Sequence, residues 1–302
     1  MRTKNELYQE ALRTIAARRQ TARALAEDAR AEAEAVIPAL RHAEEEVRVR
    51  GIRCALAGAS GKDRTAANAA LTEAKQKLAA LLAASGRPAD ALEPKFTCKK
   101  CQDTGVVDGR TCNCVHKVMQ ALRRKEIEGL SSLSISSFDT MKLSYYPNVI
   151  DPALGLNVRT YMGQLLAGLK DYAEDFSPAE NESLMLVGNA GLGKTHAALA
   201  IAGIVLDKGY DVIYVSSPDF FGKMEASRFD PSGDADTLLR TAATADLLIL
   251  DDLGTEFVTP YFITTFYSLL NNRLGAGLPT IVTTNITDGS LLEKRYTEKI
   301  SS

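Results

Sequence analysis

Eight consecutive residues in the second half of the chain have the spacing of a phosphate-binding loop. They are Gly188, Asn189, Ala190, Gly191, Leu192, Gly193, Lys194 and Thr195. An apolar run precedes them and another follows, as a strand and a helix would. Glycines let backbone N–H groups turn toward a phosphate, and a helix N-terminus favours an anion. We expect Lys194 to reach the β- and γ-phosphates of a nucleotide and the Thr195 hydroxyl to ligate Mg²⁺.

Polar side chains follow two further apolar runs. Asp251 and Asp252 end the run Leu247–Leu250, and Asn285 follows residues 280–284. Ligands of open parallel sheets bind beyond the carboxyl ends of the strands, so these side chains should face the nucleotide. We expect Asp251 to hold Mg²⁺ through water and Asp252 to polarise the attacking water, although the two roles could be exchanged. Asn285 is a candidate to orient that water or to contact the γ-phosphate, with an ordinary turn residue as the alternative.

Four of the five cysteines lie within one short segment. They are Cys98, Cys101, Cys112 and Cys114. Two close pairs of thiolates around a turn predict a tetrahedral zinc site, and four protein ligands leave no open position, so its role would be structural. The second pair is spaced CxC, which makes His116 a spare ligand candidate, and an iron–sulfur cluster is a lesser alternative. Cys54 is expected to be a small apolar helix residue.

Strand-like and helix-like segments alternate from about residue 155. Strands are predicted at 184–187, 211–215, 247–250 and 280–283, and helices at 157–173, after the glycine-rich loop and near 260–274. Such alternation predicts an α/β domain whose parallel sheet is covered on both faces.

The first 84 residues predict long helices rich in Ala, Arg and Glu. Residues 1–56 and 63–84 should form a coiled-coil-like helical hairpin, interrupted or kinked at Pro38. One predicted apolar stripe contains Leu25, Ala29, Val36, Leu40, Ala43 and Val47. Such a hairpin could pack on itself or dock the helices of a partner.

Composition limits the remaining possibilities. The chain has 302 residues, 45% hydrophobic and 25% charged, which excludes a disordered chain. Neither a membrane span nor a secretory signal is expected, which favours a cytoplasmic protein. Residues 1–130 contain 24 Lys and Arg against 17 Asp and Glu, and the rest is acidic, so the halves could have different partners. The predicted divisions are a partner-binding region at 1–93, a zinc module with its following helix at 94–130, a linker at 131–154 and a nucleotide-binding core at 155–302.

The order of these motifs resembles that of replicative helicase loaders of the DnaC/DnaI type. The resemblance rests on the basic helical N-terminus followed by CKKCQDTGVVDGRTCNC, GNAGLGKTH, LLILDDLGTE and TIVTTN. It implies an AAA+ P-loop ATPase that binds a replicative DNA helicase through its N-terminal region and helps place it on single-stranded DNA. It also implies ATP-dependent self-assembly. By motif, Gly188 to Thr195 would bind ATP and Mg²⁺, Asp251 and Asp252 would form the Walker B pair, and Asn285 would be sensor 1. The four clustered cysteines would hold zinc.

The C-terminal end departs from that family pattern. Family members continue after a stretch like residues 296–302 with an arginine finger, a sensor 2 arginine and a helical lid, and Arg295 does not match the finger's place. Either the chain is truncated or the protein has lost these groups, and in both cases we expect it to bind nucleotide but to hydrolyse it weakly or not at all. Two alternative functions remain: a transposition helper ATPase of the IstB type, which normally lacks the cysteines, and a nucleotide-binding adaptor without turnover.

Overall fold

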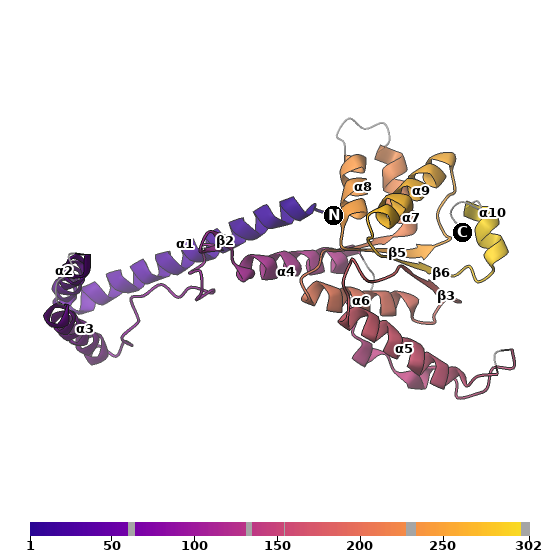
Figure 1. The fold of residues 1–302 in the computed structure, drawn as a ribbon. Helices are drawn as coiled ribbons and strands as arrows, with labels where there is room; N and C mark the ends of the chain where they lie inside the picture. Colours follow the sequence, from indigo (N-terminus) through magenta and orange to yellow (C-terminus); the bar gives the residue numbers. More distant parts are fainter. Residues whose placement is uncertain (60–63, 131–134, 154, 228–233, 297–302) are drawn as a thin grey trace. The chain divides into compact units, whose positions relative to one another are not determined.

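The chain divides into two compact units. A computed structural model (Figure 1) describes residues 1–59, 64–130, 135–153, 155–227 and 234–296. One unit contains Met1–Ala11 and Asn113–Ser302, and the other contains Leu12–Cys112. The helix that starts at Asn113 and contains Cys114 therefore groups with the nucleotide-binding core, whereas the predicted division fell at residue 130. Residues 131–134 and 154 of the predicted linker, and the stretch 297–302 used for the family comparison, lie outside the described residues.

Three helices dominate the unit Leu12–Cys112. They are α1 (Lys4–Val36), whose first residues belong to the other unit, α2 (Leu40–Ala59) and α3 (Thr65–Ala84). The break between α1 and α2 contains Pro38, as predicted. α2 packs against α3 to form the helical hairpin. The buried core of this unit also includes residues outside that hairpin, and it contains Ala33, Ile37, Leu40, Leu82 and Leu92.

The predicted apolar stripe is wrong along α1. Leu25 and Val36 are each 63% exposed, whereas Ala22, Ala26 and Ala33 are buried. In a helix rich in Ala and Arg, the apolar and polar faces differ little in hydrophobicity. Apolar residues spaced three or four positions apart can therefore be found on more than one face. The prediction followed the larger side chains, Leu25 and Val36. The buried face of α1 is instead lined by alanines.

A short β-hairpin holds the cysteine segment. Strands β1 (Val106–Val107) and β2 (Arg110–Thr111) pair antiparallel. Asp108 and Gly109 between them have φ values of 50° and 73°, the backbone region of the two-residue turns that suit hairpins. This is the turn that the sequence predicts between the two cysteine pairs.

The larger unit is built on a four-stranded sheet. The strands of the sheet are β3 (Leu184–Val187), β4 (Val212–Ser216), β5 (Leu247–Leu253) and β6 (Thr280–Thr284). The α-helices that follow the cysteine segment are α4 (Asn113–Leu130), α5 (Val158–Glu174), α6 (Lys194–Asp207), α7 (Ser217–Ala226), α8 (Asp234–Thr244), α9 (Pro260–Gly275) and α10 (Gly289–Tyr296). Two short 3-10 helices, η1 (Phe138–Thr140) and η2 (Leu143–Tyr145), lie between α4 and α5. The strands are all parallel in the order β3-β6-β5-β4. Strands β3 and β5, which precede the glycine-rich loop and carry the paired acids, are thus separated by β6.

Helices cover both faces of this sheet, which confirms the predicted α/β class. α5 and α6 pack on one face, and α7, α8 and α9 lie on the other (Figure 1). α6 is buried on nearly all sides because its interior consists of Ala, Gly and aliphatic residues. None of the described helices combines the length and apolar character that a membrane crossing requires.

Helix α4 is joined to the sheet by buried ionic contacts. The Arg123 guanidinium is 1% exposed, and its Nε lies 2.9 Å from Asp211 Oδ1 beside β4. Its second partner is Glu126 Oε2, at 2.7 Å from Nη1. Arg2 Nε lies 2.6 Å from the other oxygen of Glu126. These contacts explain why the N-terminal residues and α4 belong to the larger unit.

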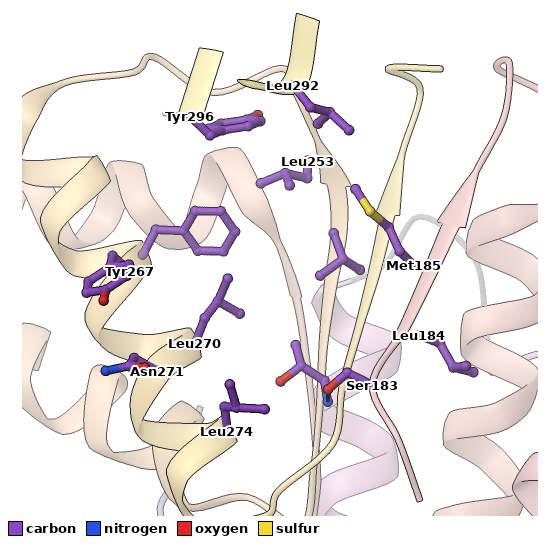
Figure 2. Close-up of a pocket in the computed structure, with 13 residues that line it drawn as sticks. Ser183, Leu184, Met185, Leu253, Tyr267, Leu270, Asn271, Leu274, Leu292 and Tyr296 are labelled. Atoms are coloured by element: carbon purple, nitrogen blue, oxygen red, sulfur yellow. Dashed lines mark hydrogen bonds between the residues drawn. The ribbon is translucent and has the colours of Figure 1, made fainter. Parts of the chain in front are cut away.

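An apolar groove of about 360 Å³ lies beside the edge strand β3 (Figure 2). Leu270 and Leu274 of α9 line one side, and Leu292 and Tyr296 lie at one end. Met185 of β3 faces it and is 48% exposed. No residue of the glycine-rich loop lines this groove, so it is separate from the nucleotide site.

Candidate nucleotide-binding and zinc sites

The glycine-rich loop connects β3 to the N-terminus of α6. Gly191 and Gly193 have φ values of 81° and 91°, where side chains with a Cβ are strained. Gly193 precedes the first turn of α6, and no side chain caps that helix end. The backbone N–H groups of the first turn therefore favour an anion, as a phosphate site requires.

Lys194 lies within the curve of this loop. Its Nζ donates to the carbonyl oxygens of Gly188 at 2.7 Å and Asn189 at 2.9 Å, and to Asn285 Oδ1 at 2.6 Å. Burial lowers the pKa of Lys194, an effect that the negative charges of Asp252 and Asp251 oppose. The ammonium group is thus held by neutral acceptors at the place where a phosphate would bind.

Asp251 faces the start of α6. Its carboxylate is 6% exposed, and Thr195 Oγ1 lies 3.0 Å from each of its oxygens. A buried carboxylate beside a hydroxyl offers the oxygen ligands that Mg²⁺ prefers. These two residues therefore fit the predicted magnesium site, and an ion held there would supply positive charge to a triphosphate.

Asp252 adopts an unusual backbone conformation. Its φ is 58°, and the pairing of β5 with β6 shifts register between Leu250 and Leu253. Asn285 Nδ2 donates to Asp252 Oδ1 at 3.0 Å, and the Asp252 N–H donates to Thr283 Oγ1 at 2.9 Å. Asn285 therefore connects Lys194 to Asp252, and the structure brings together all three predicted catalytic residues.

Residues that no motif indicated also contact the loop. Tyr146 Oη donates to the Leu192 carbonyl at 3.0 Å, and Thr140 Oγ1 lies 2.9 Å from His196 Nε2. A Cβ on Gly193 would lie 3.2 Å from Tyr146 Oη, so this glycine also permits close packing. Burial raises the pKa of Tyr146. The segment containing η1 and η2, predicted as a linker, thus forms one wall of the site.

The four clustered cysteines converge as a metal site would require. Their Sγ atoms all lie within 4.8 Å of one another, and those of Cys98 and Cys112 are 3.8 Å apart. Four thiolates on a tetrahedral zinc ion would be separated by about 3.8 Å, given Zn–S bonds of about 2.3 Å. The donor set therefore fits zinc. Within the described residues, the cluster does not include His116.

Backbone hydrogen bonds orient the first cysteine pair. Asp103 is 3% exposed and accepts from the N–H groups of Thr97 at 2.8 Å and Cys98 at 2.9 Å. The Cys98 carbonyl accepts from the N–H of Gln102 at 2.8 Å. Such supporting contacts fix the direction of ligand side chains. Spacing alone identified the cysteines, but it gave no indication of Asp103.

Comparison with known proteins finds relatives of the nucleotide-binding core. Residues 167–292 match the family model described as IstB-like ATP binding protein. The replicative helicase loader DnaC of Escherichia coli is 26% identical over 120 residues, which are 40% of this chain and 49% of DnaC. The replicative helicase loader DnaI of Bacillus subtilis is 30% identical over 124 residues, 41% of this chain and 38% of DnaI. The matches thus span at most about half of either relative.

Two solved structures of helicase loaders align with part of this chain. The crystal structure of the DnaC helicase loader aligns with 55% of this chain and 89% of its own, at 22% identity and a TM-score of 0.46. The crystal structure of DnaI aligns with 55% of this chain and 86% of its own, at 22% identity and a TM-score of 0.43.

Residues 167–292 are thus similar to IstB-like ATP-binding proteins, and the parallel strand order with its glycine-rich loop is that of a P-loop α/β fold. This domain is homologous to those of the helicase loaders DnaC and DnaI, which confirms the resemblance drawn from the motifs. The domain supports a nucleotide-binding ATPase in general. The family match begins at residue 167 and does not include the cysteines.

Proposed function

We propose that this chain is an ATP-binding loader of a replicative DNA helicase. In this function the core binds Mg²⁺·ATP, the N-terminal helices and the zinc module bind the helicase, and the complex acts on single-stranded DNA in the cytoplasm. Homology of the core to two helicase loaders supports the choice of partner.

The observation that carries the nucleotide-binding part is the convergence of five polar side chains at the N-terminus of α6. Lys194 and Thr195 come from α6, Asp251 and Asp252 from β5, and Asn285 from the loop after β6. This convergence supports the proposal, because hydroxyl, ammonium, carboxylate and amide groups are the ligands, charge and water-orienting groups that a triphosphate and its metal would need.

Exposed apolar side chains support the proposed helicase contact. Leu25 of α1 is 63% exposed and Ile52 of α2 is 55% exposed. Exposed apolar side chains on helices are suited to helix packing with a partner. The basic charge of residues 1–130 would complement an acidic partner surface.

Nucleotide binding is tested by titrating a fluorescent ATP analogue in the presence of Mg²⁺. Wild type should bind, and Lys194→Ala should not bind at matched concentrations. Lys208→Ala is the control, because Lys208 lies at the other end of α6. Equal affinity of Lys194→Ala and wild type would contradict the phosphate-loop assignment.

Helicase binding is tested by capture of a purified replicative helicase ring. Deleting residues 1–130 would remove α4 and the N-terminal residues that belong to the core, so point substitutions are preferable. Leu25→Asp and Ile52→Asp should each weaken capture. Leu274→Asp on α9, at a residue 77% exposed, should leave capture unchanged. If Leu274→Asp loses capture while Leu25→Asp and Ile52→Asp keep it, the proposal that the N-terminal helices bind the helicase is contradicted.

A transposition helper is the second candidate function. The IstB-like family match favours it, as does 26% identity over 108 residues to an ATP-binding protein of insertion sequence IS5376 from Geobacillus stearothermophilus. The cysteine module argues for the loader. Capture of a transposase on duplex DNA, without capture of a helicase on single-stranded DNA, would favour the helper.

A further inference from the structure

Three hydroxyl groups converge on the carboxylate of Asp251. Besides Thr195, Thr283 Oγ1 of β6 donates to Oδ1 at 2.6 Å and Tyr214 Oη of β4 donates to Oδ2 at 2.7 Å. These three donors come from α6, β6 and β4, and Asp251 itself ends β5. A carboxylate that is 6% exposed is therefore supplied with hydrogen bonds from three directions.

The sheet places the Tyr214 side chain within reach of Asp251. Ser216 pairs with Asp251 in the parallel register, and Tyr214 pairs with Ile249. Alternate residues of a strand share a face, so Tyr214 lies on the same face as Ile249 and Asp251. Tyr214 and Ile249 both belong to the apolar core beneath α6. The ring is held in that core at 3% exposure, and the hydroxyl at its far end reaches the carboxylate.

We propose that Tyr214 is a positioning residue for magnesium: its hydroxyl holds Asp251 in the orientation that binds Mg²⁺ together with Thr195. The inference rests on the proposed nucleotide-binding function. Tyr214 itself contacts neither the metal nor the phosphates in this proposal. Its action is exerted through Asp251.

Hydrogen-bond chemistry supplies the reason. A phenol donates strongly to a carboxylate, and the 2.7 Å separation is typical of a well-formed O–H···O bond. The bond occupies one lone pair of Oδ2, and the Thr283 bond occupies one of Oδ1, so rotation of the carboxylate would break both. Thr195 also donates to Asp251, which leaves its oxygen lone pairs available to a cation. The two supporting hydroxyls thus fix the carboxylate against the Thr195 hydroxyl.

The test is the Mg²⁺ dependence of ATP binding by the full chain with Tyr214→Phe. This variant keeps the ring in the core and removes only the donor. We expect the Mg²⁺ concentration for half-maximal binding of a fluorescent ATP analogue to rise about three- to tenfold, which is within the range for loss of one intramolecular hydrogen bond. The affinity at saturating Mg²⁺ should remain within about twofold of wild type.

Tyr172→Phe is the matched control. Tyr172 is also partly buried in this unit, but its hydroxyl donates to the Glu182 carbonyl at 2.9 Å and not to Asp251. Its Mg²⁺ midpoint should equal that of wild type. If Tyr214→Phe does not fold, Thr283→Val removes the other supporting hydroxyl and should shift the midpoint in the same direction.

Two results would overturn the inference. One is an unchanged Mg²⁺ midpoint in a folded Tyr214→Phe protein. The other is a loss of affinity that excess Mg²⁺ does not restore, because Tyr214 would then shape the nucleotide pocket. A wild-type chain without Mg²⁺-dependent ATP binding would instead refute the proposed function on which the inference rests.

Discussion

Replacing Arg123 by Met should strongly destabilise the larger unit. The guanidinium is 1% exposed and binds Asp211 through Nε at 2.9 Å and Nη2 at 3.3 Å, and Glu126 through Nη1 at 2.7 Å. Methionine preserves the apolar stem and removes the charge. Asp211 and Glu126, whose side chains are only 12% and 15% exposed, would then lose their shared cation.

The expected loss of unfolding free energy is about 3 kcal/mol. Breaking a buried ion pair by removing one partner costs about 3–5 kcal/mol, because the remaining charge is desolvated without compensation. We expect the lower end of that range, since Glu126 keeps Arg2 at 2.6 Å and both carboxylates retain some contact with water. In a unit of this size such a loss lowers Tm by about 6–12 °C.

Urea unfolding followed by far-ultraviolet circular dichroism measures the effect, because the chain has no tryptophan. Hydrogen exchange of peptides covering α4 and β4 assigns the loss to this unit. The neighbouring Arg124→Met is the control: its partner Asp207 has a side chain 74% exposed, so the change should cost less than about 1 kcal/mol. Equal small effects of both substitutions would refute the argument that α4 is fixed to the core by a buried charge.

Three further predictions address the separate sites. Cys98→Ser should reduce the zinc content from about one ion per chain, measured by metal analysis, because three thiolates bind zinc less tightly than four; undiminished zinc would exclude this ligand. Asn285→Ala should reduce the rate of ATP hydrolysis at saturating ATP more than it reduces ATP affinity, since Asn285 connects Lys194 with Asp252; reduced affinity with an unchanged rate at saturating ATP would indicate a role in binding only. Burial raises the pKa of Tyr172 to about 12, whereas the unfolded value is about 10. The folded state therefore retains this proton longer, and the stability that Tyr172 contributes below about pH 10 should be lost as the pH rises toward 12. Tyr172→Phe should flatten this part of the alkaline stability curve, and an unchanged curve would contradict the assignment.

Local sequence patterns were sufficient to predict the loop, the acids and the cysteines. Gly193 and Lys194 are adjacent in the chain, and their chemistry depends on a turn that glycine spacing specifies. Asp251 and Asn285 end separate strands, but parallel strands bring their carboxyl ends to one edge of a sheet, so their proximity follows from the fold class.

Contacts that depend on strand order were beyond the sequence patterns. Tyr214 reaches Asp251 because β4 is the neighbour of β5, and Arg123 reaches Asp211 because α4 packs beside β4. Neither a tyrosine inside an apolar strand nor an arginine in a polar helix carries a distinctive signal. Their roles arise from packing between segments far apart in the chain, which periodicity does not encode.

The charges in the nucleotide site explain why a neutral amide connects its lysine to an acid. Lys194 lies near two carboxylates, yet its direct partners are two carbonyls and Asn285 Oδ1. Releasing an ammonium from neutral acceptors costs less than breaking an ion pair, so Lys194 can transfer its hydrogen bonds to a phosphate. Asp251 and Asp252 would repel a bare triphosphate, and a divalent cation held at Thr195 and Asp251 offsets that repulsion. If this site holds Mg²⁺ as proposed, the chain should prefer Mg²⁺·ATP to free ATP, and the hydroxyls around Asp251 would contribute to that preference by keeping its carboxylate directed toward Thr195.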